Sequence, residues 1–211
     1  MDYEHEAKKA TDSMQSYRTD TSGWKVCKKS NDVVVSWRPS SEFPGNVYKG
    51  DGIISGSLLK VWECLKPIPD GLRVKWDSNV KRFELLEQIT EGTSICRTVT
   101  PSAAMGIIAP RDFVDVVVVK QYGDGSISSN ATNVTHVSCP PQPGYVRGFN
   151  HPCGCICVPV SGEPNKTQVY TFFQTDLGGL LPRSVVDSFF PSSMAEFYNN
   201  LAKSVKSHKD I

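Results

Sequence analysis

The sequence has no uninterrupted apolar run of about 18 residues, so no segment is expected to cross a bilayer as a helix. Residues 1–18, MDYEHEAKKATDSMQSYR, are polar and lack the apolar core of a secretory signal, which predicts a cytosolic protein. The formal net charge is only +1, so bulk electrostatics favour neither nucleic acid nor an acidic membrane surface as a partner.

The chain also lacks the cysteine spacing of a disulfide scaffold, and its seven cysteines are an odd number, so they cannot all pair within the chain. His151, Cys153, Cys155 and Cys157 lie close enough in sequence to suggest zinc. Alternate residues of a strand, however, lie about 6.6–7 Å apart, whereas two sulfurs on one zinc ion lie within about 4 Å. There is no second C-x-x-C pair. We therefore predict a strand of reduced thiols, and neither a metal ion nor a cofactor.

With 211 residues, 39% of them hydrophobic, the chain can bury one sizeable core, and no flexible linker divides it. We expect one α+β domain over residues 1–211. It begins with a helix at 2–18 and continues as a meander of antiparallel strands with a brief helix at 58–66. The expected strands cover 24–29, 33–39, 47–56, 80–89, 93–100, 113–122, 126–134, 145–160 and 167–176.

The last 30 residues differ from the meander. Their apolar residues recur at 185, 186, 189, 190, 194, 197, 198, 201 and 205, the 3.6-residue period of an amphipathic helix. Pro182 suits the start of this helix, whereas Pro191 should kink it or delay its start. A curved sheet covered by one such helix can enclose a volume that the helix does not fill.

The segment TPSAAMGIIAPRDF, residues 100–113, is an unusually apolar loop. Met105, Ile107 and Ile108 lie in it between two prolines. Apolar residues rarely gather in a loop that faces water. We therefore predict that this loop folds over the opening of the sheet as a lid.

Four stretches carry a resemblance to a known family: VKWDSNVKRFELLEQI, APRDFVDVVVVK, VRGFNHPCGCICVPV and FFQTDLGGLLPRSVVDSFFP. In this order they resemble the START (steroidogenic acute regulatory protein-related lipid transfer) domain family over about residues 10–207. The resemblance implies a helix-grip fold, in which a curved antiparallel sheet wraps a long C-terminal helix over an internal lipid cavity. It also implies that the 101–110 loop is the lid, and that Val185, Val186, Phe189, Phe190 and Met194 form the cavity roof.

Three further positions acquire an expected role from the same resemblance. Arg73 matches the place where the phosphatidylcholine-transfer member carries a phosphate-contacting arginine, although it could also be a surface arginine on a turn. Val117 and Thr98 stand where cholesterol-carrying relatives place a buried arginine and its acidic partner. The absence of both charges favours an amphipathic steroid with an acidic tail. Arg73 could bind the carboxylate of this tail, and Thr98 would remain as a neutral hydrogen-bond partner for the steroid.

The remaining polar candidates have simpler interpretations. Arg111 and Asp112 could be a catalytic pair, but a structural ion pair behind the lid is the favoured interpretation, while the roles of Asp115 and Arg147 stay open. No histidine stands beside a serine or carboxylate in a recognisable motif, so no catalytic residue is expected.

The resemblance thus predicts a monomeric cytosolic carrier that binds one cholesterol, oxysterol or bile-acid molecule and contacts membranes transiently. A ligand-sensing interaction module and, less favoured, a helix-grip enzyme remain as alternatives.

Overall fold

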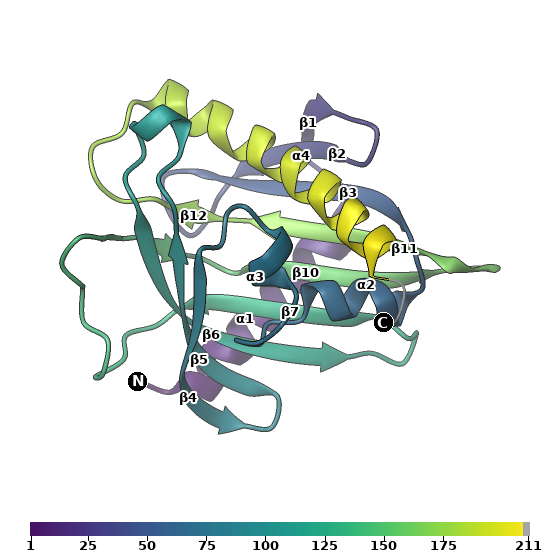
Figure 1. Ribbon diagram of the computed structural model, residues 1–211, viewed down its shortest axis with the longest axis horizontal. Helices are drawn as coiled ribbons and strands as arrows, with labels where there is room; N and C mark the ends of the chain where they lie inside the picture. The colour runs from purple at the N-terminus through teal and green to yellow at the C-terminus, as the bar shows by residue number, and fades with distance from the viewer. Residues whose placement is uncertain (209–211) are drawn as a thin grey trace.

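The computed structural model describes residues 1–208, so residues 209–211 of the expected domain lie outside it. Its elements form a layered α+β arrangement (Figure 1). In chain order they are α1 (Tyr3–Thr19), β1 (Lys25–Lys29), β2 (Val34–Pro39), β3 (Asn46–Ser55), α2 (Leu58–Leu65), α3 (Arg73–Trp76), β4 (Arg82–Thr90), β5 (Thr93–Thr100), the 3-10 turn η1 (Ala104–Gly106), β6 (Arg111–Gln121), β7 (Ile127–Asn133), β8 (Val146–Arg147), β9 (Phe149–Asn150), β10 (Cys153–Val160), β11 (Glu163–Phe173), β12 (Thr175–Asp176) and α4 (Arg183–Ser207).

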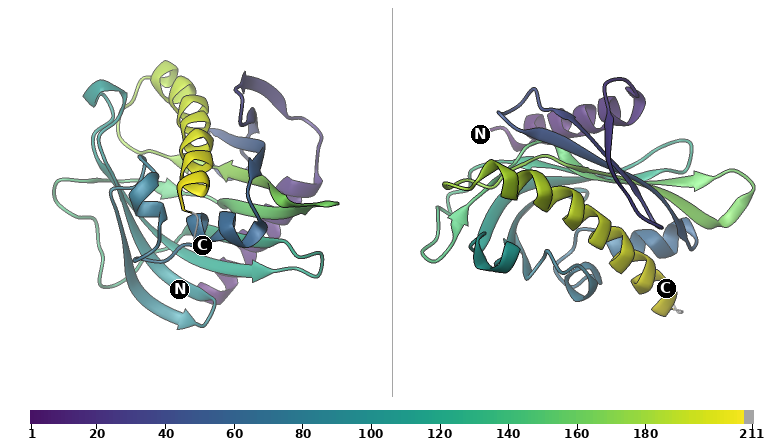
Figure 2. Two further views of the ribbon diagram at one scale, coloured as in Figure 1. Left: turned by 45° about the vertical axis from the view of Figure 1, so that its right-hand side comes forward. Right: turned by 90° about the horizontal axis from the view of Figure 1, so that it is seen from above.

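One large sheet organises the molecule. Its strand order is β1-β2-β3-β11-β10-β7-β6-β5-β4, all antiparallel, with β8 paired in parallel to β6. The sheet is strongly curved, with α4 across its concave side and α1 on the convex side (Figure 2). This arrangement confirms the helix-grip fold. No helix among residues 1–208 is both long and apolar enough to span a membrane.

Strand β6 shows how the sheet separates its two sides. Val114, Val116 and Val118 are buried in a cluster with Ala7 of α1, so they face the convex side. Alternate residues of a strand point to opposite faces. Arg111, Phe113 and the other odd-numbered residues of β6 therefore face the concave side, under α4.

Two glycines of β3 let α4 approach the sheet closely. Tyr198 is completely buried, and its hydroxyl donates to the carbonyl of Val169 at 2.7 Å. Thr171 Oγ1 lies 3.0 Å from the same hydroxyl. A Cβ atom at Gly50 would lie 2.6 Å from the Tyr198 ring, and one at Gly52 would lie 3.0 Å from it. The Tyr198 ring thus occupies the space that side chains at positions 50 and 52 would otherwise fill.

Two long predicted strands are interrupted in the structure. Residues 145–160 form β8, β9 and β10 rather than one strand, and the gap before β10 contains Pro152, which has no N–H to donate. Residues 167–176 divide at Gln174, whose buried side chain donates to Tyr17 and to the Pro152 carbonyl. Beside these breaks, Asn150 and Thr175 pair with each other in a separate two-stranded sheet, β12–β9.

The start of the C-terminal helix is where the sequence places it. Helix α4 begins at Arg183, directly after Pro182, so Pro191 lies inside the helix and does not delay its start. Residues 123–125 form the hairpin turn between β6 and β7, and Ser57 caps α2, with Ser57 Oγ accepting from Lys60 N at 3.3 Å.

Replacing Gly50 by alanine should destabilise the fold, because the new methyl group would overlap Tyr198 and Met194. We expect the free energy of unfolding in urea to fall by about 1–3 kcal/mol. Gly123→Ala is the matched control, since a Cβ atom there meets nothing within 4 Å, and it should change stability by less than about 0.5 kcal/mol. Equal stability of the two variants would contradict the close packing of α4 on β3.

Candidate ligand-binding cavity

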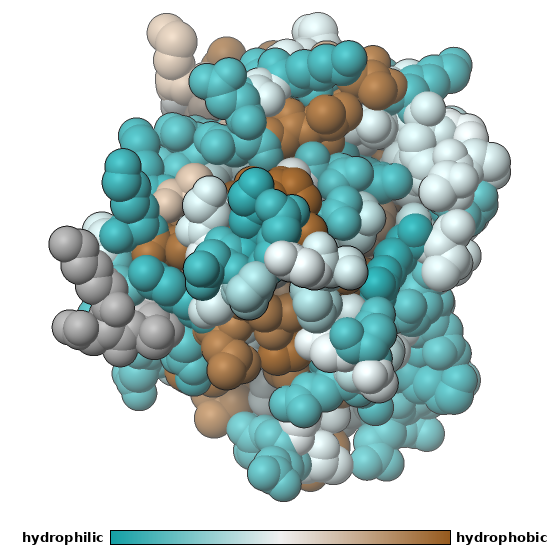
Figure 3. Space-filling model, turned by 90° about the vertical axis from the view of Figure 1, so that its right-hand side faces the viewer, coloured by the Kyte–Doolittle hydropathy of each residue, from teal (hydrophilic) through white to brown (hydrophobic). Residues whose placement is uncertain are grey.

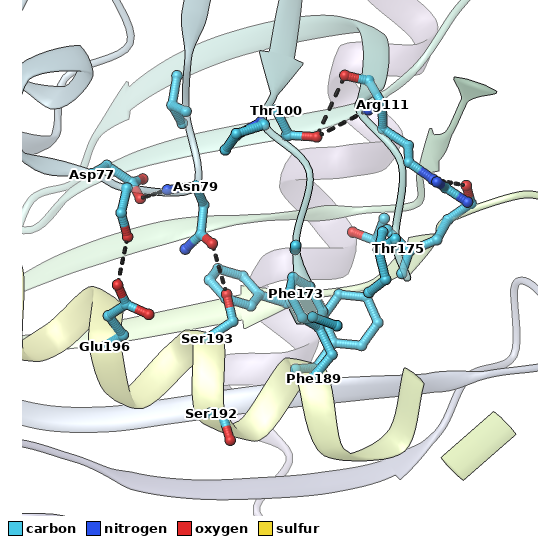
Figure 4. Close-up of a pocket in the computed structure, with 18 of the residues that line it drawn as sticks. Asp77, Asn79, Thr100, Arg111, Phe173, Thr175, Phe189, Ser192, Ser193 and Glu196 are labelled. Carbon is cyan, nitrogen blue, oxygen red and sulfur yellow. Dashed lines mark hydrogen bonds between the residues drawn. The ribbon is translucent and has the colours of Figure 1, made fainter. Parts of the chain in front are cut away.

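A cavity of about 810 Å³ lies between the concave face of the sheet and the N-terminal half of α4. Figure 4 shows its aromatic centre, with Phe173 of β11 and Phe189 of α4 among the side chains that line it. The wall includes these predicted residues: Arg73, Thr98, Met105, Ile107, Ile108, Val185, Phe189 and Phe190. Their contact with a ligand stays a prediction.

Three predicted residues do not line the cavity. Val186 is half-buried against the main hydrophobic cluster and lines a separate, smaller pocket. Val117 is buried further along β6, opposite Ser94 of β5 and Ala131 of β7. Met194 lies on the face of α4 that packs on the sheet. It is completely buried, and its sulfur packs over Gly50. Val117 and Met194 both lie on the predicted faces of their elements, but beyond the hollow part of the interior.

The predicted lid is a closed turn at the mouth of the cavity. Ala103 and Ile108 exchange two backbone hydrogen bonds, of 2.8 and 3.1 Å, which hold η1 between them. Ala104 and Met105 adopt positive φ angles of 52° and 56°, a conformation that non-glycine residues rarely adopt. Ile108 is buried, while Met105 is fully exposed. The lid therefore presents apolar side chains to both the cavity and the solvent.

Arg73 faces the cavity with a built-in partner. Its Nε donates to the buried carboxylate of Asp77 at 3.1 Å, and its guanidinium lies 5.4 Å from the centre of the Phe197 ring. Burial, the largest single effect, would lower the pKa of Arg73, but the charge and the hydrogen bond of Asp77, together with effects of the cavity-wall cysteines, outweigh it and the pKa is raised. Arg73 is therefore charged, and among residues 1–208 no group accepts a hydrogen bond from its two Nη atoms.

Sequence reasoning missed the polar edge beside Arg73. Ser78 Oγ donates to Glu196 at 2.7 Å, and Ser193 Oγ donates to Asn79 at 3.0 Å (Figure 4). These bonds tie α4 to the segment after α3. Ser193 and Glu196 flank the apolar stripe of α4, and this position beside the stripe was the signal from which they could have been predicted as cavity residues.

The predicted ion pair of Arg111 with Asp112 is wrong. Arg111 Nε, Nη1 and Nη2 donate instead to the carbonyls of Leu177, Ala109 and Gly178, at 2.9, 2.8 and 2.9 Å. Because neighbouring strand residues point to opposite faces, the two side chains cannot meet. Arg111 holds the lid's C-terminal end and the loop before α4 together at the cavity mouth.

Asp112 instead accepts from two other arginines on the convex side. Arg147 Nε and Arg97 Nε donate to it at 2.8 and 2.9 Å. Burial would raise the pKa of Asp112, but these two hydrogen bonds outweigh it and the pKa is lowered. The role left open for Arg147 is thus structural in this arrangement.

Asp115 is a buried carboxyl group on the concave side of β6. Its Oδ2 accepts from Asn150 Nδ2 at 2.9 Å, while its Oδ1 has no hydrogen-bond partner among residues 1–208. Burial raises its pKa to about 7. Asp115 is therefore partly protonated at neutral pH.

The three thiols of β10 are divided between the cavity and the core. Cys153 and Cys155 lie on the cavity wall, and Cys157 is buried in the main hydrophobic cluster. Burial raises the pKa of Cys153 and of Cys157 well above the usual range, so both thiols stay protonated. Among residues 1–208, no three histidine, cysteine or acidic side chains gather in a way that could hold a metal ion.

One histidine does lie between a serine and a carboxylate, which the sequence did not indicate. His136 Nε2 is 2.8 Å from Glu87 Oε1, and its Nδ1 is 2.7 Å from Ser138 Oγ. The imidazole also stacks on Tyr3 of α1. These residues are not on the cavity wall, so they are not placed to act on a molecule bound inside.

The comparisons with known proteins agree with this fold and cavity. The START domain model matches residues 5–211, and the chain belongs to this family. StAR-related lipid transfer protein 5 from Mus musculus is 64% identical over 190 residues, which cover 90% of this chain and 89% of that protein. Its Homo sapiens counterpart is 63% identical, over 92% of this chain and 91% of the relative.

Solved structures give the same result. The structure of human StAR-related lipid transfer protein 5 superposes with a TM-score of 0.93 at 59% identity, over 97% of this chain and 96% of that one. The human StarD13 (DLC2) lipid transfer and protein localization domain has a TM-score of 0.73 at 18% identity, covering 93% of this chain and 96% of that one. The second likeness concerns the fold alone.

The raised pKa of Asp115 predicts a pH-dependent stability. Between the unfolded pKa of about 4 and the folded pKa of about 7, the folded state binds more protons, so stability falls as pH rises through this window. Wild type should therefore lose about 3 kcal/mol relative to Asp115→Asn between pH 4.5 and pH 8. Urea unfolding of both proteins measures the difference, and a difference that does not change with pH would contradict the assignment.

Proposed function

We propose that this chain, acting as one domain over residues 1–211, binds a single lipid in its cavity and carries it between membranes through the cytosol. The observation that supports this most is a largely apolar cavity of about 810 Å³ in a member of the START family. Its relatives at 63–64% identity are named lipid transfer proteins. Covering about 500 Å² of steroid hydrocarbon would contribute about 12 kcal/mol, from which association and lid ordering subtract several kcal/mol.

We infer a steroid as the ligand, with a bile acid favoured over cholesterol and oxysterols. Thr98 leaves the wall without the acidic side chain that cholesterol-carrying relatives are expected to have there, and Val117 supplies no arginine. Arg73 offers two Nη groups to a carboxylate, while Asp77 keeps it paired when no acidic group is bound. A neutral sterol is therefore tolerated, and an acidic one gains charge-assisted hydrogen bonds.

Membrane contact is proposed to occur at the lid end of the molecule. Met105 and Leu180 are fully exposed there, and Ile107 is more than half exposed. The side seen in Figure 3 is mostly hydrophilic, with apolar side chains in separate groups. We infer that the chain acts as a monomer that touches the bilayer with its lid, so that a lipid can pass without crossing water.

Two other classes remain to be tested against the carrier. A ligand-sensing module would use the same cavity but report its filling to another protein. An enzyme would need reactive groups on the cavity wall, and the serine–histidine–glutamate arrangement at Ser138, His136 and Glu87 lies elsewhere.

Native mass spectrometry of the purified chain with cholesterol, an oxysterol, phosphatidylcholine and a bile acid tests the proposal. We expect one intact steroid per chain and its release to acceptor liposomes. Conversion of the ligand to a new mass would establish an enzyme. Retention without any release to liposomes would favour the sensor, and phosphatidylcholine as the retained lipid would contradict the steroid assignment.

Replacing Arg73 by alanine should weaken binding of a bile acid by about 1.5–3 kcal/mol, the range for hydrogen bonds to charged groups. Cholesterol binding should change far less, because a neutral sterol makes no such bond. Calorimetry with both ligands gives the two values, and Lys75→Ala, an exposed change on the same helix, is the control.

The single variant leaves buried Asp77 unpaired, which is destabilising by itself. The double variant Arg73→Ala/Asp77→Asn removes that effect and should show the same loss for the bile acid. Unchanged bile-acid affinity in both variants would show that Arg73 does not bind the acidic group.

A further inference from the structure

The cavity has polar groups on both sides of its aromatic centre. In Figure 4, Thr175 and Arg111 lie on the opposite side of Phe173 from Asp77 and Asn79. Arg73 belongs to the Asp77 side, through their ion pair. A ligand that fills the cavity therefore meets polar side chains at two separated places, only one of which is accounted for by Arg73.

The second place is a chain of hydrogen bonds that begins on the cavity wall and ends in the sheet. Thr175 and Asn150 both line the cavity. Thr175 Oγ1 donates to Asn150 Oδ1 at 2.7 Å, and Asn150 Nδ2 donates to Asp115 Oδ2 at 2.9 Å. Thr175 and Asn150 also face each other in the β12–β9 ladder, so backbone pairing fixes their separation.

Asp115 determines which way the Asn150 amide points. When Asp115 is ionised, its Oδ2 can only accept, so it takes the Nδ2 hydrogen, whereas a flipped amide would set oxygen against oxygen. The Thr175 hydroxyl then donates to Oδ1. The ionised form of Asp115 therefore fixes the orientation of the amide before any ligand arrives.

This arrangement leaves hydrogen-bonding capacity for one more group. Asn150 Nδ2 carries two hydrogens, and one of them is used by Asp115. The Thr175 oxygen donates its hydrogen, and nothing among residues 1–208 donates to its lone pairs. A ligand hydroxyl can thus accept from Asn150 and donate to Thr175, which satisfies both of its own functions.

We propose that Asn150 and Thr175 form a hydroxyl-binding subsite of the cavity, with Asp115 as the residue that positions Asn150. The ligand class is a steroid with a hydroxyl group at one end and an acidic group at the other. This inference rests on the proposed lipid-binding function and adds a second point of recognition to Arg73. Thr98, the hydroxyl partner predicted from sequence, makes no side-chain hydrogen bond among residues 1–208 that would hold its hydroxyl in place.

A matched pair of ligands isolates the subsite: 5β-cholanoic acid and the same acid with a 3α-hydroxyl group. Wild type should bind the hydroxylated acid about 5- to 160-fold more tightly, the effect of two neutral hydrogen bonds. Thr175→Val keeps the shape but removes the hydroxyl, and should lower this preference by about 2- to 13-fold, the effect of one of the two bonds. Thr11→Val, on α1 and away from the cavity, should keep the preference in full.

Asp115→Leu tests the positioning role and should also reduce the preference, whereas general destabilisation would weaken both acids equally. A full preference in Thr175→Val, or its loss in Thr98→Val instead, overturns the subsite. Equal affinity of wild type for the two acids also overturns it while leaving the proposed function intact. If wild type binds neither acid, the steroid-acid ligand class is wrong and the subsite falls with it.

Discussion

The contact of Tyr198 with Gly50 and Gly52 fixes only the C-terminal half of α4 to the concave face. The N-terminal half, with Val185 and Phe189 half-buried, reaches past the packed core and covers open space. A helix attached along its whole length would fill the curve of the sheet. The cavity thus exists because the close packing stops midway along α4, and the 101–110 loop lies at its mouth.

The charged groups around the cavity are satisfied without a ligand. Arg73 has Asp77, Arg111 has three carbonyl oxygens, and Asp115 is partly protonated beside Asn150. An unpaired buried charge would cost several kcal/mol and would demand a ligand of opposite charge. Each of these three groups thus has hydrogen-bond partners within the protein, and none depends on a ligand of opposite charge.

Periodicity predicted the fold well, because the α4 stripe and the alternating strands are long and regular. The interruptions between β8, β9 and β10 could not be located from the sequence, since they depend on how the chain around Pro152 packs against neighbouring strands. The Arg111–Asp112 error was avoidable: adjacent strand residues face opposite ways. Placing Val117 and Met194 required knowing where the hollow ends, and Asn150 with Thr175 come together only through the β12–β9 pairing, which no local signal in the sequence indicates.

The proposed function requires that the folded interior is hollow before a ligand enters. A crystal structure of the chain purified without ligand measures this directly. We expect a continuous space of about 810 Å³ under the N-terminal half of α4, with Phe173 and Phe189 on its wall. If instead these rings and their neighbours turned inward and filled the space, the interior would be an ordinary core and the carrier interpretation would be wrong.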